Sequence, residues 1–187
     1  MIIIGVGSHA TDIKAIAHRN HLTTITEYDD NPATGSPAPP GSLSGPLIIG
    51  VNNAQERRAI ALRFPHLRGA APLIDPSAII GPDVHCGHGT VVAPMATLLT
   101  RVRLGNHVHV NYHASMTRCT IGDYSTISPG AVICGDVTIG QAVLIGAGAV
   151  VADRCVIGDD AVIAAGAILP PESVLPDGAK CIGVWKP

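Results

Sequence analysis

The chain has 187 residues, a formal net charge of −2 and 47% hydrophobic residues, yet only 3% of its residues are aromatic. This charge gives no reason to expect a nucleic-acid partner, and no apolar run approaches the roughly 20 residues of a membrane-spanning helix. The start, Met1–Val6, lacks a basic segment and leads into a glycine loop, so it predicts a buried strand and not a signal peptide.

Residues 1–74 predict a separate α/β unit in which strands and helices alternate. In chain order we expect a strand at 2–4, a helix at about 10–20, a strand at 22–28, a strand at 47–50, a helix at 53–64 and a short strand at 67–73. A Pro/Gly/Ser-rich loop at 31–46 interrupts the series. This order predicts a small parallel sheet with right-handed crossovers, a truncated relative of the Rossmann-like fold.

Two segments of this unit suggest half of a nucleotide site. Gly7, Ser8 and His9 follow the first strand and open the first helix, where backbone amides favour a phosphate group. Asp29 and Asp30 end the second strand, where a Rossmann-like unit binds a ribose or base. The third glycine of the dinucleotide fingerprint is absent, because Ala10 stands there, so a tight turn needed only for packing is the competing interpretation.

From Ile80 onward an apolar residue returns at every sixth position, and a small or β-branched residue usually follows it four places later. The apolar series is Ile80, Cys86, Val92, Leu98, Leu104, Val110, Met116, Ile121, Ile127, Ile133, Ile139, Ile145, Val151, Ile157, Ile163 and Leu169. Such a fixed period predicts a solenoid of short strands and turns around a narrow core. We therefore expect residues 75–187 to form a hexapeptide-repeat parallel β-helix.

One step in this series is shorter than the others. Met116 and Ile121 are five residues apart, so this rung lacks one residue. The five cysteines show no C-x-x-C spacing, and Cys86 and Cys155 occupy core positions of the repeat. These cysteines predict small core residues in a reducing, cytoplasmic environment.

The combination of both modules resembles the family of sialic-acid O-acetyltransferases and bacillosamine-type nucleotide-sugar N-acetyltransferases. The resemblance covers nearly the whole chain. Its matching stretches include Ile4–Ala10, Asp29–Asn31, Leu73–Ala78, Ile121–Tyr124, Ile127–Ala131, Gly135–Gly140 and Ile145–Val151. It implies a left-handed β-helix, acetyl-CoA as the acyl donor, and transfer of the acetyl group to the amine of a nucleotide-linked sugar.

The resemblance also implies where ligands bind. In a homotrimer, acetyl-CoA would lie between neighbouring β-helices, against residues near Gly135, Ala147 and Ala165 and beside Thr126, the position of a second family histidine. The nucleotide would contact Gly7, Ser8, His9, Asp29 and Asp30. For His9, helix capping or packing is the alternative role.

The sequence departs from this family at the catalytic base. Counting back from Cys119, the family histidine falls on Thr117, and its usual acidic neighbour is Arg118. Counting forward from Asn111, it falls on Arg118, so neither count yields a histidine. Histidine suits proton abstraction because its pKa lies near neutrality. Three hypotheses follow: His113 acts as a relocated base, positioning alone suffices, or the protein is a catalytically degraded homologue that binds both ligands without transfer.

The remaining histidines of the repeat, His85, His88, His107 and His109, fall at positions that do not point inward, which predicts solvated or interface roles. Several histidines on a β-helix are also similar to the gamma-class carbonic anhydrases, which hold zinc between subunits. No pair shows the close spacing of that family together with a third partner about two coils upstream, so we expect no metal site.

Overall fold

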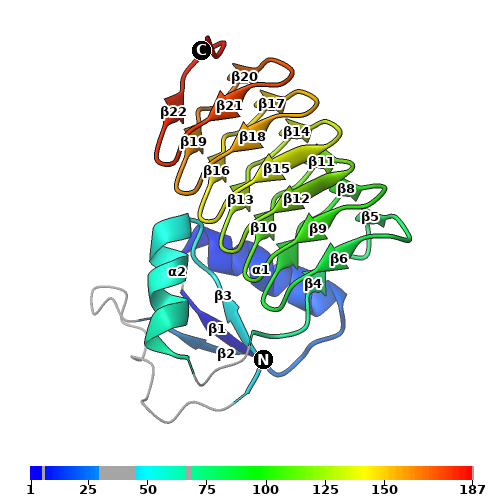
Figure 1. Ribbon diagram of the computed structural model, residues 1–187. Helices are drawn as coiled ribbons and strands as arrows, with labels where there is room; N and C mark the ends of the chain where they lie inside the picture. Colours follow the sequence, from blue (N-terminus) through cyan, green and yellow to red (C-terminus); the bar gives the residue numbers. More distant parts are fainter. Residues whose placement is uncertain (6, 30–44, 66–68, 187) are drawn as a thin grey trace.

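The computed structural model describes residues 1–5, 7–29, 45–65 and 69–186, which form a small α/β unit and a long β-solenoid (Figure 1). The α/β unit sits against the N-terminal coils of the solenoid, and the C-terminus lies at the far end. The expected fold, an α/β unit followed by a parallel β-helix, is therefore confirmed.

The α/β unit contains a parallel sheet in the order β2 (Thr26–Tyr28), β1 (Ile2–Ile4) and β3 (Leu47–Ile49). The side chains of β1 alternate between the two faces of the sheet. Helix α1 (Ser8–Arg19) packs on the face that carries Ile3 and Ile48, and α2 (Ala54–Arg63) on the face that carries Ile2 and Ile4. Both faces of this sheet are consequently covered.

Each helix has a sequence-encoded reason for its position. Helix α1 buries Ala10, Ile13, Ile16 and Ala17, which recur at helical spacing along one face. Helix α2 begins where the side chain of Asn53 accepts a hydrogen bond from the Glu56 amide at 2.9 Å.

The strand expected at 67–73 is not part of this sheet. Residues 66–68 lie outside the described residues, and Gly69 makes only an isolated bridge to Leu47. Leu73 belongs to β4, the first strand of the solenoid, because its amide donates to the Thr90 carbonyl at 2.9 Å. The chain thus enters the solenoid at β4.

Three parallel sheets form the walls of the solenoid, and each is named here after its first strand. The β4 sheet comprises β4 (Leu73–Ile74), β7 (Val91–Val92), β10 (His109–Val110), β13 (Thr126–Ile127), β16 (Leu144–Ile145), β19 (Val162–Ile163) and β22 (Lys180–Cys181). The β5 sheet comprises β5 (Ile79–Ile80), β8 (Thr97–Leu98), β11 (Ser115–Met116), β14 (Val132–Ile133), β17 (Val150–Val151) and β20 (Ile168–Leu169). The β6 sheet comprises β6 (His85–Cys86), β9 (Arg103–Leu104), β12 (Cys119–Ile121), β15 (Val137–Ile139), β18 (Val156–Ile157) and β21 (Val174–Leu175).

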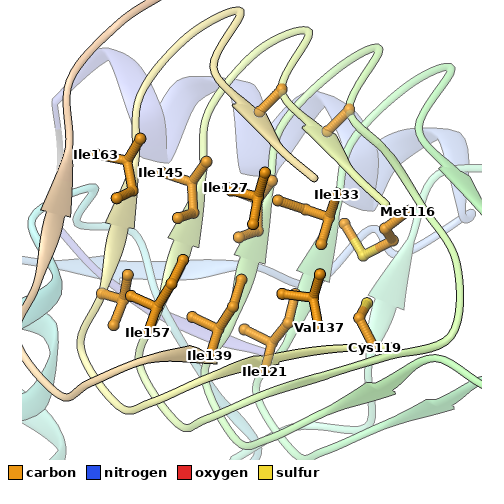
Figure 2. Close-up of a cluster of buried hydrophobic side chains, with 14 of the residues drawn as sticks. Met116, Cys119, Ile121, Ile127, Ile133, Val137, Ile139, Ile145, Ile157 and Ile163 are labelled. Atoms are coloured by element: carbon orange, nitrogen blue, oxygen red, sulfur yellow. The ribbon is translucent and has the colours of Figure 1, made fainter. Parts of the chain in front are cut away.

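The core consists of the apolar residues that define the repeat. Ile121, Ile139 and Ile157 stack on neighbouring strands of the β6 sheet, opposite Ile127, Ile145 and Ile163 of the β4 sheet (Figure 2). All six are at most 2% exposed. Burial of this much aliphatic surface is the main stabilising contribution in such a narrow fold.

Three corners per coil join the sheets. The His113 corner joins the β4 sheet to the β5 sheet, the Arg118 corner joins the β5 sheet to the β6 sheet, and the Tyr124 corner returns the chain to the β4 sheet. Each corner places one residue of most coils at positive φ, including His113 (59°), Arg118 (43°) and Tyr124 (63°). The α/β unit packs on the outer face of the β4 sheet and reaches the Tyr124 corner.

Candidate functional site

The carboxyl edge of the α/β sheet brings the expected nucleotide-binding segments together. The Gly5 amide donates to the Tyr28 carbonyl at 2.8 Å, which places the loop after β1 beside Asp29. Gly5 has φ of +115°, and a Cβ there would lie 2.9 Å from the Gly50 carbonyl oxygen, so only glycine fits. Asp30 lies outside the described residues.

The N-terminus of α1 at this edge is open. Gly7 is the N-cap residue, no side chain caps the helix, and the first turn carries no acidic residue. Gly7 and Ser8 are exposed. The free amides of the first turn are therefore available to an anion such as a phosphate group.

His9 joins the two units of the molecule. Its Nε2 lies 2.7 Å from Nδ1 of His109, which sits on β10 of the solenoid and is 1% exposed. Burial, together with the Arg57 cation, lowers the pKa of His9 to about 4, and the same causes place the pKa of His109 well below its ordinary value. Both rings are thus neutral near pH 7, and one donates the shared hydrogen bond to the other.

Arg57 of α2 is the central polar contact of the same junction. It is completely buried, and it donates to the carbonyls of His107 (2.8 Å), Val51 (2.7 Å) and Ser125 (3.1 Å). It also donates to the carbonyls of Asn52 and Tyr124. Burial lowers the pKa of Arg57 to about 9, which leaves it protonated at neutral pH.

Thr126 lies beneath this arginine. Its side chain is fully buried, accepts from Arg57 at 2.8 Å and donates to the Asn52 carbonyl at 3.0 Å. Sequence reasoning placed Thr126 beside acetyl-CoA, but the structure commits its hydroxyl to the junction between the units. A cofactor would reach it only after the junction opened.

The other expected cofactor residues lie on two different corners. Ala147 and Ala165 are exposed at the His113 corner, in successive coils. Gly135 lies at the Arg118 corner, next to Thr117. Within one chain, the β5 sheet separates the two groups.

His113 and Thr117 are also on separate corners. They stand at opposite ends of β11, so the shortened rung does not bring His113 to the position vacated by the family histidine. His113 is exposed and has positive φ. The next three coils have a glycine with positive φ at the same position of this corner, namely Gly130, Gly148 and Gly166.

The missing residue falls on the Arg118 corner. Thr97 and Ser115 are register partners, and so are Arg103 and Thr120, yet the chain from Ser115 to Thr120 is one residue shorter than the chain from Thr97 to Arg103. The Thr117 amide donates to the Ile133 carbonyl, and the Leu99 amide donates to the Met116 carbonyl in the same way. Thr117 and Leu99 are therefore equivalent positions, and the missing residue follows Thr117. The lost position is therefore the one that Gly135 occupies in the next coil.

The Arg118 side chain fills the space next to Gly135. A Cβ on Gly135 would lie 1.8 Å from Nη2 of Arg118. The guanidinium contacts Asp136 at 3.5 Å and Asp153 at 3.9 Å, and Asp153 also accepts from the Gly135 amide at 2.9 Å. A fixed positive charge thus stands at the corner where the resemblance predicted a proton acceptor.

Two clefts flank Arg118. The Thr117 cleft, about 330 Å³, is lined by residues that include Leu99, Ser115, Thr117, Val132, Cys134 and Gly135. The arginine cleft, about 220 Å³, is lined by Arg101, Arg103, Arg118, Thr120, Asp136 and Thr138, with Cys119 and Val137 behind them. A third cavity, about 170 Å³, lies between α1 and the solenoid beside His9 and His109.

The sequence predicted a solvated or an interface role for His107 and His109, and both are buried. His109 contacts His9 of the α/β unit, and His107 stacks on Tyr124 and accepts from Arg57 through its carbonyl. It missed Arg57, because nothing in the helical pattern distinguishes this arginine from its exposed neighbours. Among the described residues, no group of three or more His, Cys, Asp or Glu side chains is arranged to hold a metal ion. None of the described helices combines the length and hydropathy needed to cross a membrane.

Comparison with known proteins agrees with this architecture. Residues 136–171 match the family model of the bacterial transferase hexapeptide (six repeats). The bifunctional protein GlmU of Mycolicibacterium smegmatis is 29% identical over 129 residues, which cover 64% of this chain and 23% of that protein. The GDP-perosamine N-acetyltransferase of Escherichia coli O157:H7 is 32% identical over 68 residues, covering 35% of this chain and 31% of that enzyme. The matches thus span only about a quarter to a third of these relatives.

A solved structure matches nearly the whole chain. The acetyltransferase domain of PglB from Neisseria gonorrhoeae is 27% identical, with a TM-score of 0.85 over 96% of this chain and 94% of that one. The same domain in complex with acetyl coenzyme A gives a TM-score of 0.83. The resemblance stated from the sequence is confirmed: repeats and fold are those of the hexapeptide-repeat acyltransferases.

Proposed function

We propose that this protein transfers an acetyl group from acetyl-CoA to the amine of a nucleotide-linked amino sugar. The observation that carries the proposal is the full-length similarity to the PglB acetyltransferase domain, which includes both the α/β unit and the solenoid. A relative named as a GDP-perosamine N-acetyltransferase supports the same class of acceptor.

The proposed nucleotide site is the carboxyl edge of the α/β sheet. The open first turn of α1, with Gly7, Ser8 and His9, would hold a phosphate group, and Asp29 would accept hydrogen bonds from the ribose or base. Asp30, which the sequence predicts to share this role, lies outside the described residues.

The proposed acyl site needs two copies of the chain. Ala147 and Ala165 lie on the His113 corner, whereas Gly135 and Thr117 lie on the Arg118 corner. A cofactor that contacts all four would bridge the His113 corner of one protomer and the Arg118 corner of its neighbour. Such repeated heterologous contacts close into a ring, so we propose a homotrimer.

In the proposed reaction the amine nitrogen attacks the thioester carbonyl, the carbon–sulfur bond breaks, and the proton lost by the amine ends on the CoA thiolate. In the trimer, the His113 of one protomer would face the Thr117 cleft of the next and could accept the amine proton. Positioning of the two ligands would supply the rest of the acceleration.

A second function is favoured by one observation. Thr117 and Arg118 stand where the resemblance predicts a histidine and an acid, so the corner has neither an imidazole nor a carboxylate at these two positions. The competing proposal is a homologue that binds acetyl-CoA and a nucleotide-sugar without transferring the acyl group.

Release of free thiol from acetyl-CoA separates the two proposals. Purified protein would be incubated with acetyl-CoA and a panel of uridine-, thymidine- and guanosine-linked amino sugars. Acceptor-dependent thiol release supports the transferase. Binding of both ligands by calorimetry without thiol release supports the binding homologue, and binding of neither contradicts both proposals.

A further inference from the structure

The arginine cleft carries more positive charge than the contacts around it neutralise. Arg101 and Arg103 are exposed and make no ion pair with any described residue. Arg118 is the one member that is paired, with Asp136 and Asp153. Three guanidinium groups and two nearby carboxylates therefore leave a net positive cleft.

Hydrogen-bond donors are arranged there in two parallel rows. On the outer face of the β6 sheet, Arg103, Thr120 and Thr138 are register partners on successive strands. On the adjoining corner, Arg101 and Arg118 follow each other in successive coils. Neighbouring strands lie about 4.8 Å apart, so adjacent donors can reach oxygens of the same phosphate or of two linked phosphates.

The one-residue deletion contributes to this arrangement. Without a residue at the position of Gly135, Arg118 lies one coil after Arg101 and its side chain occupies the space beside Gly135. The short corner thus lacks the position that Gly135 occupies in the next coil, and the guanidinium of Arg118 fills the space beside that glycine.

We propose that Arg101, Arg103 and Arg118 form a binding site for the phosphate groups of a substrate. This proposal rests on the proposed function, which supplies two candidate ligands: acetyl-CoA with its phosphate groups, and a nucleotide-sugar with its diphosphate. Either ligand would be held with its reactive end directed to the Thr117 cleft, since Arg118 lines both clefts.

Inorganic pyrophosphate tests the site without reference to acyl transfer. Calorimetric titration at low salt would compare the wild type with R101A/R103A. The matched control is R154A, because Arg154 lies on the same corner with positive φ but is paired with Glu172 at 2.9 Å. We expect roughly tenfold weaker binding for each arginine removed from the cleft, and no change for R154A.

Titrations with CoA, dephospho-CoA and a uridine diphosphate sugar then identify the source. Weakening confined to CoA assigns the 3′-phosphate, equal weakening of CoA and dephospho-CoA assigns the donor's diphosphate, and weakening confined to the sugar nucleotide assigns the acceptor. Equal pyrophosphate binding by wild type and R101A/R103A would overturn the site. Pyrophosphate discrimination without thiol release would instead uphold the site and count against the transferase.

Discussion

His9 and His109 are 100 positions apart in the chain, yet their imidazole rings share a hydrogen bond of 2.7 Å between Nε2 and Nδ1. The rings are tilted by 37° with centroids 4.8 Å apart. Burial and the Arg57 cation lower the pKa of both rings, so the folded state favours the neutral forms. This contact makes the attachment of the α/β unit sensitive to acid.

The first prediction is a loss of stability on acidification. The folded pKa of His9, about 4, lies below the ordinary 6.5, so the unfolded chain binds more protons in this interval and stability falls as pH drops from about 6.5 to about 4. His107, with a pKa also lowered to about 4, adds to the same slope. Urea unfolding measured from about pH 7.5 to about pH 4.5 checks it.

The variant H9Q should unfold more easily at neutral pH and show a shallower dependence on pH. H113Q is the matched control, because His113 is exposed on an outer corner and should retain the wild-type slope. A wild-type slope in H9Q would contradict the assignment of acid sensitivity to this pair.

The second prediction concerns Arg57. Replacing it by methionine removes the donor for five backbone carbonyls and for Thr126, so the free energy of unfolding should fall by about 3 kcal/mol or more. R58M is the control: Arg58 is about half exposed and 4.0 Å from Asp160. Similar unfolding midpoints for the two variants would show that the junction does not depend on Arg57.

The third prediction separates stability from catalysis at His113. Since the residue has φ of 59°, H113G should be as stable as the wild type or more stable by up to about 1 kcal/mol. If His113 accepts the amine proton, H113G and H113A should lower the transfer rate by roughly 100- to 10,000-fold. Unchanged turnover in both variants would reject the relocated base.

The fourth prediction tests the vacated position. T117H should raise the transfer rate if the site is degraded only by loss of the imidazole. Because the corner is one residue short, a glycine inserted between Met116 and Thr117 in the T117H variant should be needed for the full gain. The insertion would move the imidazole to the position that Gly135 occupies in the next coil. Thiol release by the single variant and by the insertion variant compares the two effects, and equal rates would show that the length of the corner is immaterial.

The fifth prediction contrasts two glycines. A Cβ on Gly122 would lie 2.6 Å from the carbonyl carbon of Gly140, so G122A must displace backbone and should destabilise by several kcal/mol. At Gly135 the obstacle is the end of the Arg118 side chain, which can move. G135A should therefore cost about 1 kcal/mol, as measured by chemical unfolding.

The solenoid could be predicted from the sequence because its contacts repeat. Ile139 packs against the equivalent isoleucine of the coil before and of the coil after it, so a period of six specifies strand, turn and core together. Even the missing residue between Met116 and Ile121 was visible as a change of spacing, and the structure assigns it to the Arg118 corner.

The junction between the units could not be predicted in the same way. In an isolated solenoid the outer face of β10 would be exposed to solvent. His109 on this face is buried because the α/β unit packs against it. Arg57 belongs to a helix whose pattern carries no sign of a buried cation, and its acceptors come from residues up to 69 positions away. Contacts of this kind follow from the tertiary arrangement and leave no local signal.

The short corner at Arg118 does not disturb the strands on either side of it. Ser115 keeps its register with Thr97 and Val132, and Thr120 keeps its register with Arg103 and Thr138, so the deletion is absorbed within a single bend. The strands of the next coil therefore pair in the same register as they do elsewhere in the solenoid. One corner can therefore be a residue shorter while the strands on both sides keep their register, so the length and side chains of a corner are set separately from the stacked strands that carry it.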